Sequence, residues 1–182
     1  LPKMFIDIGA ANKAEAEARV KIGDAAGLKR EFADLGKRVV SKAMDDRVGC
    51  AVLVETINRL GETPANDIYF VFSVQEEVGL RGAKTAAFGI DPDLGVALDV
   101  TAVGDYPKAK TMDVSLGKGA AIKIKDSSVM THPKVKALMT EIAQANDIPY
   151  QYEVLERGGT DAGAIHLTRE GVPSGCISIP CR

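Results

Sequence analysis

Short apolar runs separated by helical patterns constrain the fold of this 182-residue chain more than any other feature. The runs at 67–74, 95–103 and 175–179 are almost continuously apolar, which is typical of strands buried on both faces of a sheet. Two further strands are expected at 120–125, where the alternation indicates a half-exposed strand, and at 150–155. A sixth strand is expected at the N-terminal end, over residues 3–8.

Helical patterns fill the intervals between these runs. The predicted helices cover 13–20, 46–60, 81–88, 133–145 and 161–169. Asn12 and Glu15 form a capping-box pattern at the start of the first helix. The second helix is so apolar that we expect it to pack on several sides.

The alternation of strands and helices predicts an α/β protein. We expect a three-layer α/β/α sandwich built on a mixed, mostly parallel sheet. In folds of this kind, functional sites lie outside the carboxyl ends of the strands.

Composition narrows the class of protein. The chain is 46% hydrophobic and 26% charged, as in ordinary globular proteins. A net charge of −2 argues against nucleic acid as a partner, and no apolar run approaches the roughly 20 residues of a membrane-spanning helix. Three cysteines in apolar surroundings and no export signal predict a reduced, cytoplasmic protein. Because the chain begins with Leu1, we expect it to be a piece of a longer polypeptide.

Acidic residues stand at the ends of the apolar runs or inside them. Asp45 and Asp46 precede an apolar helix, and helix capping by itself explains them well. Glu76 and Glu77 follow the run at 67–74, where a solvated loop explains them equally well. Asp99 lies within GVALDVTA, and a carboxylate buried there needs an arginine, a set of N–H donors or a metal ion.

Considered together, these three acidic positions indicate a metal centre. Carboxylates at the ends of neighbouring strands repel one another, and Lys42, Arg47 and Arg81 are the few cations nearby in the sequence. One or two divalent cations would balance the charge, and carboxylate with imidazole ligands suits zinc, cobalt or manganese. The two histidines, His132 and His166, fall at the start of a helix and within one, where ligand roles are not expected.

Six segments occur in a characteristic order: FIDIGA, KAMDDRVGCAVL, FVFSVQEEVGLRGA, ALDVTAVGD, GGTDAGAIH and GVPSGCISIPCR. Together they resemble the co-catalytic metallo-aminopeptidases of the tetrahedral (TET) type, metallopeptidase family forty-two. Members of this family are also called glutamyl aminopeptidases and, in older usage, cellulases or endoglucanases. The resemblance covers essentially the whole chain, and it implies a zinc-exopeptidase-like fold and removal of residues from the free amino end of peptides.

The resemblance also implies a role for each acid. Asp45 corresponds to the carboxylate that bridges two metal ions, zinc or cobalt, and its peptide bond to the next residue is often cis in such enzymes. Glu77 corresponds to a ligand of one ion and Asp99 to a ligand of the other. Glu76 corresponds to the general base. Because neighbouring side chains on a strand point to opposite faces, the chain must bend at the two glutamates, and Gly79 provides the freedom to do so.

The segment GGTDAG at 158–163 is a candidate wall of the substrate pocket. Glycine permits close approach of backbone at Gly159, while Thr160 and Asp161 offer polar contacts. A tight turn in which Thr160 or Asp161 caps the following helix explains the same segment equally well.

Members of the family have two further ligands, both histidines, one well before FIDIGA and one soon after the final Arg182. This sequence contains neither, so we expect the 182 residues to hold two ions only as part of a longer chain. Residues 1–24 resemble the tail of an inserted oligomerisation (dimerisation) domain, and residues 25–182 resemble a catalytic domain lacking its N-terminal part and its C-terminal end. The resemblance implies a homo-oligomer, with dimers assembling into a dodecamer.

Two other functions stay open at this point. The chain could be an inactive fragment or assembly module of such an enzyme. It could also be a glycoside hydrolase, which needs two carboxylates about 5–10 Å apart and usually an aromatic-lined groove. The absence of Trp and an aromatic content of 5% argue against the glycoside hydrolase.

Overall fold

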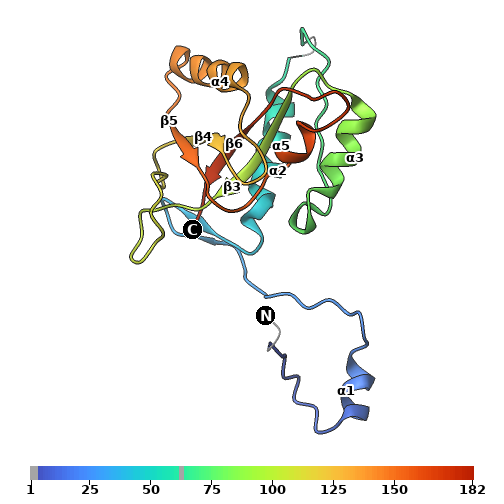
Figure 1. The fold of residues 1–182 in the computed structure, drawn as a ribbon. Coiled ribbons are helices and arrows are strands. Elements are labelled where there is room, and N and C mark those ends of the chain that lie inside the picture. The colour runs from blue at the N-terminus through green and yellow to red at the C-terminus, as the bar shows by residue number, and fades with distance from the viewer. Residues whose placement is uncertain (1–3, 62–63) are drawn as a thin grey trace. The chain divides into compact units, whose positions relative to one another are not determined.

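A computed structural model describes residues 4–61 and 64–182 (Figure 1). The chain forms two compact units, Leu1–Lys42 and Ala43–Arg182. The boundary between the tail of an inserted domain and a catalytic domain, expected between residues 24 and 25, stays a prediction.

The first unit contains one helix, α1 (Lys13–Arg19), and a two-stranded antiparallel ribbon, β1 (Ala33–Asp34) with β2 (Val39–Val40), among its described residues. The strand expected at 3–8 is wrong for residues 4–8, which form no regular secondary structure. No strand among the described residues supplies backbone hydrogen bonds to this segment, and its large apolar side chains are largely exposed.

The predicted cap of α1 is confirmed. The side chain of Asn12 accepts a hydrogen bond from the Glu15 N–H at 3.0 Å. The Glu15 carboxylate reaches back to the N–H of Ala11 at 3.0 Å, one residue earlier than in the usual capping box.

The second unit is built on a four-stranded sheet. Its strands are β3 (Gly95–Thr101), β4 (Ala120–Lys125), β5 (Tyr150–Val154) and β6 (Ser174–Pro180). They lie in the order β3-β6-β4-β5. β3 with β6 and β4 with β5 are parallel pairs, whereas β4 and β6 are antiparallel. The predicted mixed, mostly parallel sheet is therefore confirmed.

Helices cover both faces of this sheet. On one face, α4 (Pro133–Ala145) packs so closely that a Cβ at Gly175 of β6 would lie 2.8 Å from Val135 and 3.0 Å from Met139. On the other face, α5 (Ala162–Ile165) contributes to a core cluster that includes Cys176. Because consecutive strand residues point to opposite faces, Gly175 and Cys176 mark opposite sides, and the three-layer α/β/α arrangement follows.

The remaining helices precede the sheet strands in the chain. They are α2 (Met44–Arg59), the 3₁₀ helix η1 (Glu76–Val78) and α3 (Arg81–Ile90). α2 contacts β3, but Gly49 is its single buried residue among those described. The expectation that this helix packs on several sides is therefore wrong.

The strand expected at 67–74 is also wrong, because these residues form no strand. Phe70 is half-buried, but the other five large apolar side chains of this segment are 39–69% exposed: Ile68, Tyr69, Val71, Phe72 and Val74. A strand requires a hydrogen-bonded neighbour, and in the described sheet β3 is an edge strand that pairs with β6 alone.

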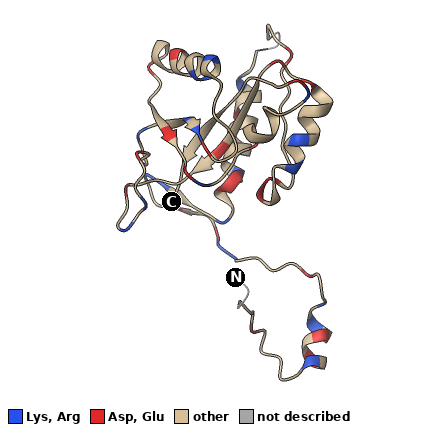
Figure 2. Ribbon diagram, viewed as in Figure 1, with Lys and Arg blue, Asp and Glu red and all other residues tan. Residues whose placement is uncertain are grey.

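The charged residues of the second unit are interspersed along the ribbon and not gathered in one element (Figure 2).

No helix among residues 4–61 and 64–182 combines the length and apolar character that crossing a membrane requires.

Candidate active site

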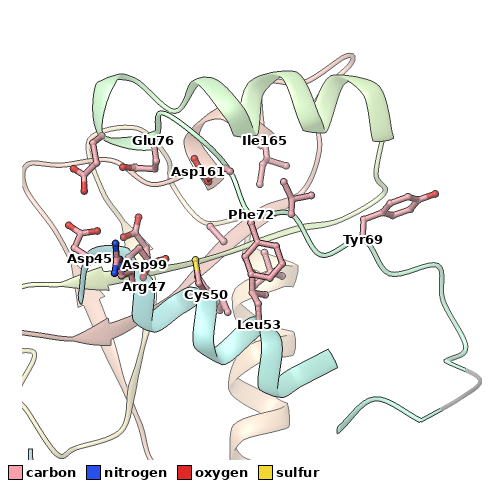
Figure 3. Close-up of a pocket in the computed structure, with 17 residues that line it drawn as sticks. Asp45, Arg47, Cys50, Leu53, Tyr69, Phe72, Glu76, Asp99, Asp161 and Ile165 are labelled. Atoms are coloured by element: carbon pink, nitrogen blue, oxygen red, sulfur yellow. The ribbon is translucent and has the colours of Figure 1, made fainter. Parts of the chain in front are cut away.

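A cavity of about 330 Å³ lies beside β3 and the first turns of α2. Its acidic lining residues come from four separate segments of the chain. They are Asp45, Asp46, Glu76, Glu77, Asp99 and Asp161. Figure 3 shows the acidic side chains gathered at one end of the cavity and the apolar Leu53, Phe72 and Ile165 toward the other.

Asp45 and Asp46 are presented by an irregular first turn of α2. Their φ/ψ angles are −82°/110° and −116°/46°, outside the helical range, and the peptide bond that joins them is cis, as the resemblance implied. The Asp46 carboxylate accepts a hydrogen bond from the Gly49 N–H at 3.0 Å. Asp46 therefore caps the regular part of the helix, while Asp45 lies at the cavity without a capping bond among the described residues.

Glu76 and Glu77 open the short helix η1. The chain turns sharply around them, because Gln75 has φ 57° and Gly79 has φ 122°. A φ of 122° strains any residue with a side chain, so Gly79 fits the position for a physical reason. The predicted bend at the two glutamates is confirmed.

Asp99 and Asp161 lie deeper than the other acids. Asp99, on β3, is 9% exposed and accepts a hydrogen bond from the Val100 N–H at 2.7 Å. Asp161 immediately precedes α5, and one of its oxygens accepts from the Ser73 hydroxyl at 2.5 Å. Its other oxygen, Oδ1, is buried and has no hydrogen-bond partner among the described residues.

The negative charge of the six carboxylates in the cavity is not balanced by ion pairs with lysine or arginine among the described residues. Burial, reinforced by neighbouring carboxylates, raises the pKa of Glu76 and of Asp99 to about 7 and that of Asp46 to about 6. Burial also raises the pKa of Asp161. Crowded carboxylates of this kind favour either protonation or a bound cation.

The donor chemistry of the cavity suits a divalent cation, because carboxylate oxygens are ligands for such ions. The unpartnered Oδ1 of Asp161 points to the same need. However, no group of three or more His, Cys, Asp or Glu side chains in the described part of the chain is arranged to hold an ion. Neither His132 nor His166 lines the cavity. The described residues thus offer suitable ligands without a complete coordination shell.

The residues proposed from sequence for the substrate pocket are separated by the structure. Asp161 lines the cavity, but Gly159 and Thr160 do not. Thr160 is 1% exposed, and its hydroxyl donates to the Asp126 carboxylate at 3.2 Å. A Cβ on Gly159 would lie 3.1 Å from Ser128.

Comparison with known proteins shows the family of this chain. The model of the M42 glutamyl aminopeptidase family matches residues 1–182. The chain belongs to the M42 glutamyl aminopeptidase family. A protein of Acetivibrio thermocellus is 57% identical to it over 182 residues, which are 100% of this chain and 55% of that protein.

Solved structures of similar proteins agree with the M42 assignment. An aminopeptidase of the archaeon Desulfurococcus kamchatkensis is 46% identical, with a TM-score of 0.89 over 96% of this chain and 50% of that one. The TET1 peptidase of Pyrococcus horikoshii, which can assemble into a tetrahedron or a large octahedral shell, is 36% identical, with a TM-score of 0.82 over 96% of this chain and 51% of that one. The chain spans about half the length of these relatives.

Two residues of the M42 cavity received no individual role from the sequence. Asp46 lines the cavity, and the only signal for it was the doubled aspartate, which helix capping also explains. Ser73, which donates to Asp161, is 88 residues distant in the chain. No local pattern marks such a contact, since it exists only after the sheet and its loops have folded.

Proposed function

We propose that this M42 chain is the catalytic part of a metal-dependent aminopeptidase, which removes residues one at a time from the free amino end of peptides. The observation that carries the proposal is the group of six carboxylates around one cavity, without a lysine or arginine ion pair among the described residues. Membership of the M42 family supports the reaction class.

Three acids are proposed as metal ligands. Asp45 would lie between two divalent ions, zinc or cobalt, with Glu77 on one ion and Asp99 on the other. When bound, such ions polarise a scissile carbonyl and lower the pKa of water toward neutrality. The M42 chain would contribute the negative charge that holds them, from Asp99 inside the sheet and from the more exposed Asp45 and Glu77.

Glu76 is proposed as the general base. It lies in the cavity one residue before a proposed ligand, Glu77, where its carboxylate would be within reach of the attacking water. From there it takes a proton from that water and passes it to the leaving amine. Asp161 is proposed to form part of the wall of the substrate pocket, with Gly159 and Thr160 behind it as support.

We also propose that the protein is a cytoplasmic homo-oligomer that acts on peptides and not on nucleic acid. The odd cysteine count and the net charge of −2 support the compartment and the exclusion of nucleic acid. The assembly of the Pyrococcus horikoshii TET1 peptidase supports oligomerisation, with residues 1–24 as a candidate contact segment.

A pair of peptides tests the reaction class. The full-length protein is expected to shorten an unblocked peptide from its amino end, and to leave the same peptide intact after N-terminal acetylation. Mass spectrometry follows the products, and a cellulose digest assayed for reducing sugar serves as the control. Internal cleavage of the acetylated peptide, or release of sugar, would contradict the proposal. No product in either assay would favour an inactive assembly module.

A further inference from the structure

A buried group of charges lies on the same face of the sheet as Asp99, away from the cavity lining. Lys123 on β4 and Glu153 on β5 are directly opposite each other in the parallel register and are both fully buried. The Lys123 ammonium lies 2.5 Å from Glu153 Oε1, which also accepts the Thr101 hydroxyl at 2.6 Å. Lys123 faces a second buried carboxylate, Asp126, at 3.9 Å.

These charges are not explained by stability alone. Burying an ion pair costs desolvation energy, and apolar residues of similar volume are often at least as stabilising. Alternation along β4 predicted a half-exposed strand, yet Lys123 is fully buried there. Asp126 lies next to a loop of the candidate site, because its carboxylate accepts a hydrogen bond from Thr160.

Asp126 connects two loops. Its Oδ1 accepts hydrogen bonds from the Ser128 N–H at 2.7 Å, the Ser128 hydroxyl at 2.8 Å and the Val129 N–H at 2.8 Å. Its Oδ2, the oxygen that faces Lys123, accepts the Thr160 hydroxyl at 3.2 Å. One carboxylate therefore fixes its own turn and also holds the residue immediately before Asp161.

Further contacts tie these two loops together. The Ser127 N–H donates to the Gly158 carbonyl at 3.1 Å, and the Thr160 N–H contacts the Ser128 hydroxyl at 3.3 Å. The two loops approach so closely that a Cβ on Gly163 would lie 2.3 Å from the hydroxyl oxygen of Ser128. The segment 158–163 is thus held at several points, and Asp161 is the residue within it that lines the cavity.

We propose that Asp126, supported by the Lys123–Glu153 pair, is a positioning residue that acts through Thr160 to hold Asp161 at the acidic end of the cavity. This inference rests on the proposed aminopeptidase function. Displacing a group at an active site by about 1 Å can cost about 100-fold in rate, so a rigid buried support behind Asp161 has a functional role in addition to any effect on stability.

The test is Thr160→Val in the full-length protein, which keeps the side-chain shape and removes the hydroxyl that meets Asp126. We expect kcat/KM on an unblocked peptide to fall about 10–100-fold, with bound metal unchanged. Thr160→Ser restores the hydroxyl and is expected to recover most of the loss. Thr131→Val is the matched control, because Thr131 is also buried, and its hydroxyl donates to the Lys123 backbone carbonyl at 2.6 Å, with no hydrogen bond to segment 158–163.

Amide hydrogen exchange separates failure of this inference from failure of the proposed function. Thr160→Val is expected to accelerate exchange in segment 158–163, whereas Thr131→Val is not, whether or not the protein is an aminopeptidase. An inactive wild-type protein would refute the proposed function. The exchange result would then still test whether Asp126 holds segment 158–163 through Thr160. Unchanged exchange in Thr160→Val, or a kcat/KM equal to that of Thr131→Val in an active protein, would overturn the inference.

Discussion

Replacing Glu76 by glutamine is expected to lower kcat of the full-length protein about 10²–10⁴-fold, the range in which general bases contribute, while the bound metal stays unchanged. Glutamine keeps the shape of the side chain but cannot accept the proton of the attacking water. Steady-state kinetics on an unblocked peptide give kcat, and elemental analysis of the purified variant gives the metal content.

The neighbouring glutamate provides the control for this prediction. Glu77→Gln is an identical chemical change one residue away, and it is expected to reduce the metal content because Glu77 is the proposed ligand. If Glu76→Gln lost metal and Glu77→Gln kept it, the assignments of base and ligand would be reversed.

Replacing Asp45 by asparagine is the second change with a large expected effect. A residue that lies between two ions contributes charge to both, whereas loss of an outer-shell partner of a metal ligand already costs about 10–100-fold. We therefore expect Asp45→Asn to lower activity by more than about 100-fold and to lower metal content, measured together on the same preparation.

Asp46→Asn is the matched control for that change. Asparagine is as good a helix cap as aspartate, and its amide oxygen can still accept the Gly49 N–H that Asp46 accepts at 3.0 Å. This variant is expected to keep its metal. Retention of full metal content in Asp45→Asn would contradict the bridging role.

The fold was predictable where local pattern and tertiary environment agree. The helix expected at 133–145 is α4, and the apolar runs at 95–103 and 175–179 became β3 and β6 with small shifts of their ends, although Val96 of β3 is 45% exposed and not buried as expected. The run at 67–74 has the same apolar character but forms no strand. Apolar composition indicates a preference for a sheet interior, whereas a strand exists only if another strand supplies its hydrogen bonds.

The candidate site was predictable in the same partial way. Acids placed against apolar runs identified Asp45, Glu76, Glu77 and Asp99, and the structure brings these four to one cavity. Their individual roles stay predictions. Asp126 and Thr160 are 34 residues apart in the chain, and their hydrogen bond forms only when the two loops have folded together. No local sequence pattern predicts such a contact.

Metal dependence is the most direct test of the central claim. The full-length protein is stripped with a chelator, dialysed and titrated with zinc or cobalt while release of the amino-terminal residue from an unblocked peptide is followed. We predict that activity falls to background in the stripped protein and returns as about two ions bind per chain, as expected for a two-metal site. Full activity in a protein shown by elemental analysis to contain no divalent metal would contradict the claim.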